Sequence, residues 1–145
     1  MSDSLQLQEL EASLEGNLFY DDLHKKIYAT DASAYRIMPL AVAIPKSEND
    51  IINIIRFASK NKISITPRTA GTSLAGQTVG NGIIVDVSKH FTKIVSFDSE
   101  KKTITVQPGV IRDELNLYLK PHGLFFAPTT STTNRCMIGG MVGNN

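Results

Sequence analysis

Residues 66–80 read TPRTAGTSLAGQTVG, and this stretch differs at one position from a class of nucleotide-binding loop. Between Gly71 and Thr78 it fits the phosphate-binding pattern G-x-x-x-x-G-K-[ST], except that Gln77 replaces the lysine. A neutral glutamine cannot supply the ammonium group that contacts the outer phosphates of a nucleoside triphosphate. The residues that follow, VGNGIIVD, predict a turn and a strand in place of the helix whose N-terminus would face those phosphates. The sequence therefore argues against a triphosphate site.

A loop of this composition can still hold a diphosphate through its main chain. Successive backbone N–H groups that point inward form an anion-binding nest, and such a nest needs no following helix. Gly71 permits close approach of the backbone, Thr72 and Ser73 add hydroxyl donors, and Arg68 adds positive charge. The alternative is a tight surface turn that binds nothing, because glycine-rich loops are common. A dinucleotide site of the Rossmann type is not supported, since no G-x-G-x-x-G follows a predicted strand.

The residues around the loop predict an α+β fold. The apolar periodicity of residues 47–62 predicts a helix, and the short apolar runs 40–44 and 63–66 on either side predict strands. A strand, a helix and a strand within about thirty residues form a βαβ unit, so we expect these strands to be parallel. The inner face of the helix is expected to carry Ile51, Ile55 and Ala58, and Ile52 and Ile54 are expected to widen it.

Other patterns complete the predicted organisation. We expect helices over residues 4–15 and 110–120, a strand over 83–87, and a hairpin whose antiparallel strands are 93–97 and 103–107. Residues 17–38 and the glycine-rich tail predict no regular element. The fold class is therefore a parallel βαβ unit followed by antiparallel strands.

Composition excludes some classes of partner. The 145 residues carry 15 basic and 14 acidic side chains, and a net charge of +1 provides no electrostatic case for binding nucleic acid or an anionic membrane. Cys136 is the single cysteine, so no intrachain disulfide can form. No signal-peptide core and no apolar run of about 20 residues occurs, so we expect a protein without a transmembrane segment, either cytoplasmic or peripheral to the inner membrane. The histidines have no ligand spacing, and no metal site is expected.

The stretch PRTAGTSLAGQ strongly resembles the pyrophosphate loop of FAD-linked oxidases of the vanillyl-alcohol-oxidase-like superfamily, which carry an FAD-binding domain of the PCMH type. The motifs AVAIPKS, GIIVDVS, VQPGV, PTTST and IGGMVGNN stand around it in the order typical of the first part of that domain. TDASAYR and LKPHGLFF are similar to the D-2-hydroxyacid dehydrogenase branch, in particular to bacterial fusions with an iron–sulfur domain. The resemblance implies a helical lead-in at residues 1–27 and the N-terminal portion of the FAD-binding domain at 28–145, truncated at its C-terminus.

The resemblance also implies which residues contact FAD. The pyrophosphate would be wrapped by Arg68, Thr69, Ala70, Gly71, Thr72 and Ser73, with Gln77 close by. The flavin cleft and a second contact stretch would be formed by Pro108, Gly109, Pro128, Thr129, Thr130 and Ser131. The isoalloxazine or ribityl region would lie against Cys136, Gly139, Gly140, Gly143, Asn144 and Asn145. Some relatives attach FAD through a loop histidine, but Thr72 stands in that place here, so non-covalent FAD is expected.

The function implied by this resemblance is oxidation of a D-2-hydroxy acid to a 2-oxo acid, with electrons passing to an iron–sulfur domain. No residue stands out as the catalytic base, and the chain by itself is expected to lack activity. Two alternatives remain: an alcohol or sugar oxidase of the same superfamily, and a truncated scaffold that folds but binds no flavin. For Arg36, contact with a substrate carboxylate and a structural salt bridge both remain open.

Overall fold

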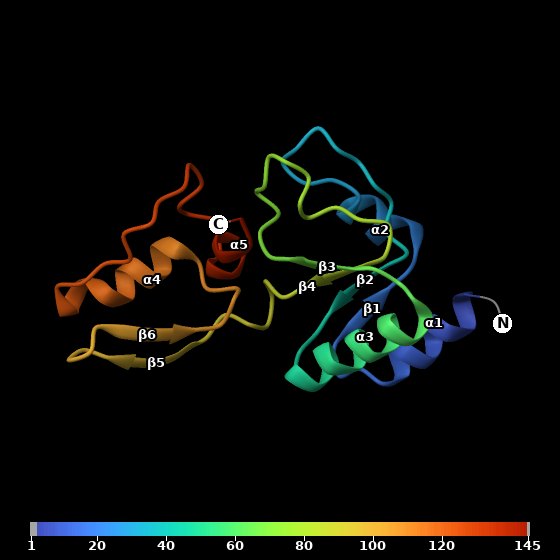
Figure 1. Cartoon of the computed structure of the whole chain (residues 1–145), viewed down its shortest axis with the longest axis horizontal. Helices are drawn as coiled ribbons and strands as arrows, with labels where there is room; N and C mark the ends of the chain where they lie inside the picture. The colour runs from blue at the N-terminus through green and yellow to red at the C-terminus, as the bar shows by residue number, and fades with distance from the viewer. Residues whose placement is uncertain (1–2, 145) are drawn as a thin grey trace.

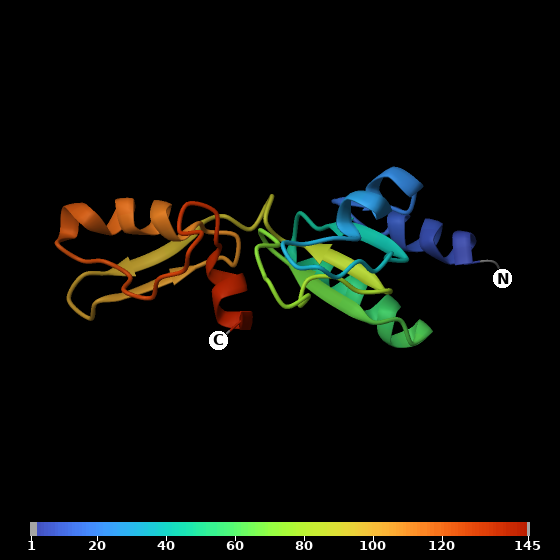
Figure 2. The same cartoon turned by 90° about the horizontal axis from the view of Figure 1, so that it is seen from above.

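The computed structural model describes residues 3–144, which form two lobes side by side along the long axis of the molecule (Figures 1 and 2). The elements in chain order are α1 (Asp3–Ala12), β1 (Asn17–Phe19), α2 (Asp22–Tyr28), β2 (Ala41–Ile44), α3 (Glu48–Asn61), β3 (Ile65–Arg68), β4 (Ile83–Asp86), β5 (Ile94–Asp98), β6 (Thr103–Val106), α4 (Arg112–Leu119), the 3-10 helix η1 (Lys120–His122) and α5 (Ile138–Asn144). The first lobe holds the elements up to β4, the second holds β5, β6 and α4, and α5 lies between the lobes (Figure 1). No helix within residues 3–144 combines the length and apolar character needed to cross a bilayer.

The first lobe is built on a four-stranded sheet in the order β1-β2-β4-β3. Strands β2 and β3 both run parallel to β4, which confirms the parallel βαβ unit predicted from the sequence. Every residue of β2 and β4 is buried, as expected for central strands with continuous apolar sequences. β3 lies at the edge of the sheet. Pro67 is tolerated in this strand because no further strand pairs with it and needs the N–H group that proline lacks. The glycine loop follows this edge strand directly.

The orientation of α3 differs from the sequence prediction. Ser47 caps the helix as expected, since its hydroxyl accepts a hydrogen bond from the Asp50 N–H at 3.3 Å. The buried face carries Ala58 and Ile54, both expected there, at 2% and 1% exposure, whereas Ile55, predicted to point inward, is 52% exposed. The cause is Asp50, which is also buried and accepts backbone hydrogen bonds at 2.8 to 2.9 Å. Because residues four apart share a helix face, burying Asp50 turns Ile54 inward with it.

Three short elements were not predicted. Residues 17–38, expected to be irregular, contain β1 and α2, and the tail contains α5. The carboxylate of Asp21 caps α2 by accepting hydrogen bonds from the N–H groups of Leu23 and His24. β1 has 3 residues and α2 has 7, lengths over which periodicity carries little information. The α5 sequence IGGMVGN is rich in glycine, which lowers intrinsic helix propensity, so this helix depends on its tertiary contacts.

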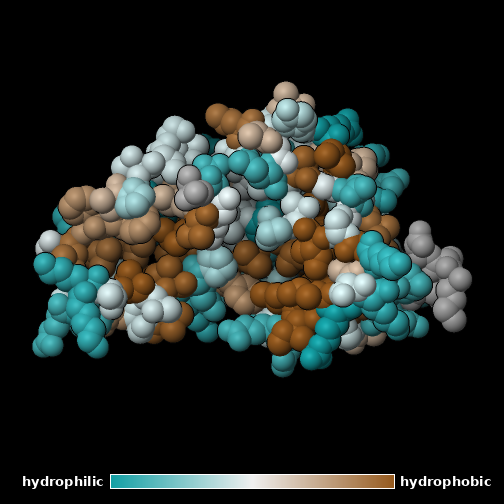
Figure 3. Space-filling model, in the orientation of Figure 1, coloured by the Kyte–Doolittle hydropathy of each residue, from teal (hydrophilic) through white to brown (hydrophobic). Residues whose placement is uncertain are grey.

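The second lobe matches its prediction closely. β5 and β6 form the expected antiparallel hairpin, and α4 runs alongside it (Figures 1 and 2). Leu115 and Leu119 of α4 are buried with Val110, and Gly123 ends the following 3-10 turn in the left-handed conformation. Not all hydrophobic side chains are buried in the cores: some lie on the surface of both lobes (Figure 3).

Candidate functional site

A cleft of about 700 Å³ lies between the glycine loop, α5 and the segment that precedes α5. Most of the residues predicted to contact FAD line it. These are Arg68, Thr69, Gly71, Thr72, Ser73, Gln77, Pro108, Pro128, Thr129, Thr130, Ser131, Cys136, Gly139, Gly140, Gly143 and Asn144. The tertiary structure thus brings three stretches that are distant in sequence to one hollow, between the two lobes of the molecule.

Two of the described residues predicted to contact FAD, Ala70 and Gly109, do not line the cleft. Gly109 is instead buried against the 87–91 turn: its N–H donates to the Phe91 carbonyl at 2.7 Å, and a Cβ would lie 2.7 Å from that oxygen. Close backbone packing, and not contact with the cleft, therefore explains the glycine there. Asn145 lies outside the described residues.

The backbone amides of Thr69 to Ser73 belong to a loop that lines the cleft. Within residues 3–144, none of these amides donates a hydrogen bond to a protein acceptor. Gly71, in the middle of this stretch, has φ +66, a left-handed conformation that residues with a Cβ rarely adopt. Consecutive unpaired N–H groups at a cleft form an anion nest, which suits the diphosphate of a dinucleotide. The amides are not tied up in the pairing of β3 with β4, an arrangement that would have been incompatible with this assignment.

The Arg68 side chain packs beneath the loop. Its Nη1 donates to the Thr30 carbonyl at 2.9 Å, and its guanidinium carbon lies 5.1 Å from the centre of the Tyr28 ring. A Cβ on Gly71 would lie 2.6 Å from Arg68 Nη2, so the guanidinium supports the turn at Gly71 from one side. Within residues 3–144 no carboxylate forms an ion pair with Arg68, and its charge therefore adds to the positive potential of the unpaired amides.

A partly buried tyrosine and a buried aspartate lie next to this arginine. The Tyr28 hydroxyl donates to Asp86 Oδ2 at 2.6 Å. Burial raises the pKa of Tyr28 well above its ordinary value, and the hydrogen bond to the Asp86 carboxylate raises it further. Tyr28 is therefore a permanent donor at physiological pH, and it holds α2 against the end of β4.

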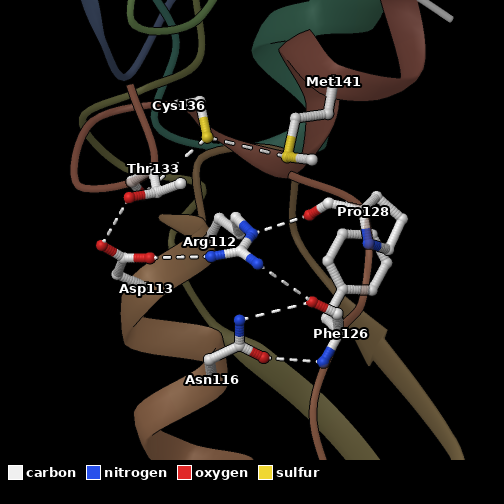
Figure 4. A network of polar contacts seen from close by, with 8 residues as sticks. All are labelled: Arg112, Asp113, Asn116, Phe126, Pro128, Thr133, Cys136 and Met141. Carbon is white, nitrogen blue, oxygen red and sulfur yellow. Dashed lines mark hydrogen bonds and ion pairs between the residues drawn. The ribbon is translucent and has the colours of Figure 1, made fainter. Parts of the chain in front are cut away.

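The second wall of the cleft is held by a polar network that the sequence did not reveal (Figure 4). Arg112 Nε donates to the Pro128 carbonyl at 2.7 Å, and Asn116 exchanges hydrogen bonds with the backbone of Phe126 at 2.6 and 3.3 Å. Asp113 accepts from the Thr133 hydroxyl at 3.0 Å and pairs with Arg112. Side chains of α4 thus fix both ends of residues 126–133, which include the PTTST stretch. An arginine, an aspartate and an asparagine at a helix start are too common to indicate this role.

Cys136 is a buried packing residue at the back of this wall. Its Sγ lies 3.8 Å from the Thr133 carbonyl and 3.7 Å from Met141 Sδ, and only 5% of the residue is exposed (Figure 4). Such contacts are those of a small hydrophobic side chain with a weak S–H donor. The thiol links the turn at residues 131–135 to α5.

The glycines of α5 allow close packing against the rest of the cleft. A Cβ on Gly139 would lie 2.5 Å from the Pro108 Cβ, and one on Gly140 would lie 2.6 Å from the Thr69 hydroxyl. The glycines of α5 therefore let this helix contact both Pro108, at the start of the second wall, and Thr69 in the glycine loop. The hydrogen bond from Gln77 Nε2 to Asn144 Oδ1, 3.0 Å long, joins the loop to α5 at the C-terminal end of this helix.

Two polar residues of the segment between α2 and β2 lie outside the cleft wall. Asp31 accepts hydrogen bonds from the Thr78 hydroxyl at 3.0 Å and from the Ser33 N–H at 2.8 Å. Arg36 forms no ion pair within residues 3–144, so no structural salt bridge holds it there. Within the same residues, no three His, Cys, Asp or Glu side chains gather as metal ligands.

Comparison with known proteins places these features in a family. A family described as "FAD binding domain" matches residues 39–145. The chain is 44% identical over 143 residues to D-2-hydroxyglutarate dehydrogenase of Haemophilus influenzae, which covers 97% of this chain but 14% of that protein. It is 35% identical over 130 residues to glycolate oxidase subunit GlcD of Bacillus subtilis, covering 87% of this chain and 28% of that protein. The chain therefore spans about one seventh of the length of the first of these relatives.

Solved structures share the fold. The chain superimposes on alkyldihydroxyacetonephosphate synthase with a TM-score of 0.81, covering 97% of this chain and 29% of that one at 18% identity. A BBE-like 1 variant of Physcomitrella patens gives a TM-score of 0.74 over 92% of this chain and 29% of that one, at 22% identity. These likenesses confirm the predicted α+β architecture. The match over residues 39–145 shows that this chain belongs to the FAD binding domain family.

Proposed function

We propose that this chain is the N-terminal portion of the FAD-binding domain of a flavin-dependent D-2-hydroxyacid dehydrogenase. The observation that carries the proposal is the arc of unpaired amides from Thr69 to Ser73 at the wall of the cleft. In this proposal residues 28–145 form the domain portion and residues 1–27 lead into it. Sequence identity of 44% to a protein named D-2-hydroxyglutarate dehydrogenase supports the same assignment.

The residues present fit FAD in their chemistry. The amides of Thr69 to Ser73 would hold the diphosphate, with the Arg68 charge behind them and Thr72 and Ser73 hydroxyls beside them. Gly139 and Gly140 let α5 pack closely against Pro108 and Thr69, so that this helix forms one wall of the cleft. Thr129, Thr130 and Ser131 present exposed hydroxyl groups from the opposite wall. When bound, FAD supplies the redox chemistry, accepting a hydride equivalent from the carbon that bears the substrate hydroxyl.

We propose that FAD is held non-covalently. No histidine is among the residues that line the cleft within the described part of the chain. Thr72 occupies the loop position at which a histidine would be needed, and the Cys136 thiol is turned toward Thr133 and Met141. Denaturing the full-length protein should therefore release all of its flavin into the filtrate. Flavin that stays with the precipitated polypeptide would contradict this assignment.

The substrate proposed is a D-2-hydroxy acid, and its oxidation product is the 2-oxo acid. Relatives named D-2-hydroxyglutarate dehydrogenase, glycolate oxidase subunit GlcD and D-lactate dehydrogenase support this class of substrate. Iron–sulfur centres are the proposed electron acceptor, and their ligands would have to lie outside these 145 residues, which contain one cysteine. An alcohol or sugar oxidase is the alternative, and the structural likeness to a xylooligosaccharide oxidase at 20% identity supports only the fold.

Two measurements on the full-length protein test this proposal. The visible absorption spectrum of the purified protein should show bound flavin, and a colourless protein that takes up no added FAD would indicate a non-binding scaffold. Reduction of the flavin by D-lactate or D-2-hydroxyglutarate, but not by alditols, is the expected result. Reduction by alditols alone would favour the oxidase alternative.

A further inference from the structure

The glycine loop has few bonds of its own. Residues 69–82 form no helix or strand, and the amides of Thr69 to Ser73 are unpaired within the described residues. Inside the loop, the hydrogen bond from the Ala75 N–H to the Ser73 hydroxyl is 3.4 Å long, close to the limit for such a bond. Ordering an irregular segment costs about 1–2 kcal/mol per residue in backbone entropy, so contacts from elsewhere have to hold this shape.

Four of those contacts come from the segment 28–36, hereafter the clamp, which lies outside the family match at residues 39–145. The Ala32 N–H donates to the Gly71 carbonyl at 3.2 Å, in the middle of the amide arc. The Thr30 carbonyl accepts from Arg68 Nη1 at 2.9 Å, at the start of the loop. The Asp31 carboxylate accepts from the Thr78 hydroxyl at 3.0 Å, near the end of the loop.

A fourth contact packs the clamp against the second glycine of the loop. Gly76 has φ +75, and a Cβ there would lie 2.6 Å from Cδ2 of the Tyr35 ring. The clamp thus meets the loop at its start, at both left-handed glycines and near its end. Contacts at successive points along a loop restrict its backbone more than one strong contact would, because each shortens the free segment between fixed points.

The clamp is itself well ordered by internal bonds. Thr30 pairs with Arg36 in an antiparallel bridge, and the Ile37 N–H donates to the carbonyl of Ala29, which is 0% exposed. Asp31 Oδ1 accepts from the Ser33 N–H at 2.8 Å, and the Ser33 hydroxyl accepts from the Tyr35 N–H at 3.1 Å. A segment fixed in this way can hold a neighbouring loop without being ordered by it.

We propose that the clamp is a positioning element for the cofactor: it holds the amides of Thr69 to Ser73 in their diphosphate-binding shape, with the Asp31–Thr78 hydrogen bond as its latch. This inference rests on the proposed FAD-binding function. Asp31 is not in the cleft wall, so its effect on FAD passes through the loop. Both of its carboxylate oxygens are used, one within the clamp and one on the loop, which is why it joins the two segments.

The first test measures FAD affinity in the full-length protein. Asp31→Ala removes both hydrogen bonds of the carboxylate, and we expect the FAD dissociation constant to rise about tenfold, the typical effect of losing a charge-assisted bond. Asp31→Asn keeps the size and one carbonyl oxygen, so an intermediate loss is expected. In a double-mutant cycle, Asp31→Ala and Thr78→Val should be strongly non-additive if the latch is their shared contact.

Asp98→Ala is the matched control. Asp98, like Asp31, accepts two hydrogen bonds, from the N–H groups of Glu100 and Lys101 at 3.0 and 2.9 Å, but it lies at the β5–β6 turn and not in the cleft wall. FAD affinity of this variant should equal that of the unmodified protein. If Asp31→Ala weakens FAD no more than Asp98→Ala does, the inference is overturned. Should Asp31→Ala not fold, the same comparison is made with Asp31→Asn and Asp98→Asn.

The second test does not depend on FAD. Limited proteolysis of the flavin-free protein with chymotrypsin should cleave after Leu74, which is 78% exposed in the loop, faster in Asp31→Ala than in Asp98→Ala. An unchanged cleavage rate there would overturn the clamp even where FAD binding is altered. If the unmodified protein binds no FAD, the proposed function fails, while the proteolysis comparison still decides whether residues 28–36 order the loop.

Discussion

Gln77 donates a hydrogen bond to Asn144 at 3.0 Å, although the two residues are 67 positions apart in the chain. The contact joins the glycine loop to α5 and closes one end of the candidate FAD cleft. The glutamine that breaks the triphosphate-binding pattern therefore has a role within this fold. It connects the glycine loop to α5, which otherwise touches this loop where Gly140 packs against Thr69.

Removing this contact should loosen the cleft. For Gln77→Ala in the full-length protein, we expect FAD release to accelerate about 2- to 10-fold, the range that corresponds to the 0.5–1.5 kcal/mol of an ordinary hydrogen bond. Both side chains are exposed, which favours the lower part of that range. Stopped-flow measurement of flavin release checks this. An Asn144→Ala variant should behave alike, and additive effects of the two substitutions would show that the bond between them is not the cause.

Gly71→Val should abolish flavin content in the full-length protein. Its backbone has φ +66, and the added Cβ would lie 2.6 Å from Arg68 Nη2, so the arc of amides cannot keep its shape. Gly123→Val is the control, because Gly123 also has φ +66 but a Cβ added there would have nothing within 4 Å. Backbone strain should lower the stability of both variants by about 1–2 kcal/mol, whereas only Gly71→Val should lose its flavin content. Equal flavin content in the two variants would show that the glycine loop is not part of the FAD-binding site.

Two glycines of α5 should respond to alanine with opposite signs. Gly139→Ala places a Cβ 2.5 Å from Pro108, which overpacks the contact between α5 and the second lobe, and should lower stability by about 1–3 kcal/mol. Gly143→Ala meets nothing within 4 Å and should raise stability by about 0.5–1 kcal/mol through helix propensity. Urea unfolding of this chain and the two variants measures both effects. If both substitutions changed the free energy of unfolding in the same direction, α5 would not be packed against Pro108 as described.

The buried carboxylate of Asp50 should make the free energy of unfolding depend on pH in the acidic range. Burial by itself raises the pKa of Asp50, but hydrogen bonds from the N–H groups of Lys46, Glu15 and Gly16 outweigh burial and hold this pKa below its usual value. The stabilisation is therefore present above the unfolded-state pKa of about 3.9 and is lost as the pH falls through the lower folded-state value. Asp50→Asn should cost roughly 2–4 kcal/mol at pH 7.

Unfolding of the chain and of Asp50→Asn at pH 7 and near pH 3 measures this dependence. The stability gap between them should narrow at the lower pH, where protonation removes the advantage of the carboxylate. Asp98→Asn, a substitution of a partly exposed carboxylate at a turn, is the control and should change stability by less than about 1 kcal/mol. A gap for Asp50→Asn that is as wide near pH 3 as at pH 7 would refute the assignment.

The 145-residue chain should bind FAD weakly compared with the full-length protein. Ligand sites usually bury about 70–90% of a bound molecule, whereas Thr129, Thr130, Ser131 and Asn144 are exposed in this cleft. Hydrophobic side chains also lie open on both lobes (Figure 3). Titration of the chain with FAD, followed by flavin fluorescence, tests this expectation. Tight stoichiometric uptake would show that the walls described here are sufficient.

Much of the fold was predictable because its signals are local. The continuous apolar runs of β2 and β4, the capping serine before α3 and the turn between β5 and β6 each act over a few residues. Gly71 and the hydroxyl residues after it likewise indicate an anion nest from their residue types alone. Short elements such as α2 and the glycine-rich α5 escaped prediction because their formation depends on contacts beyond their own length.

The sequence by itself determined the strands, the glycine loop and the residue types that suit a diphosphate. Only the tertiary structure decided which face of α3 is buried, which side chains hold the second wall, and what orders the loop. The bond between Asp31 and Thr78 spans 47 residues, and Arg112 reaches a carbonyl 16 residues away. Contacts of this kind have no local period or spacing, because they arise where the packed chain brings distant groups within hydrogen-bonding distance.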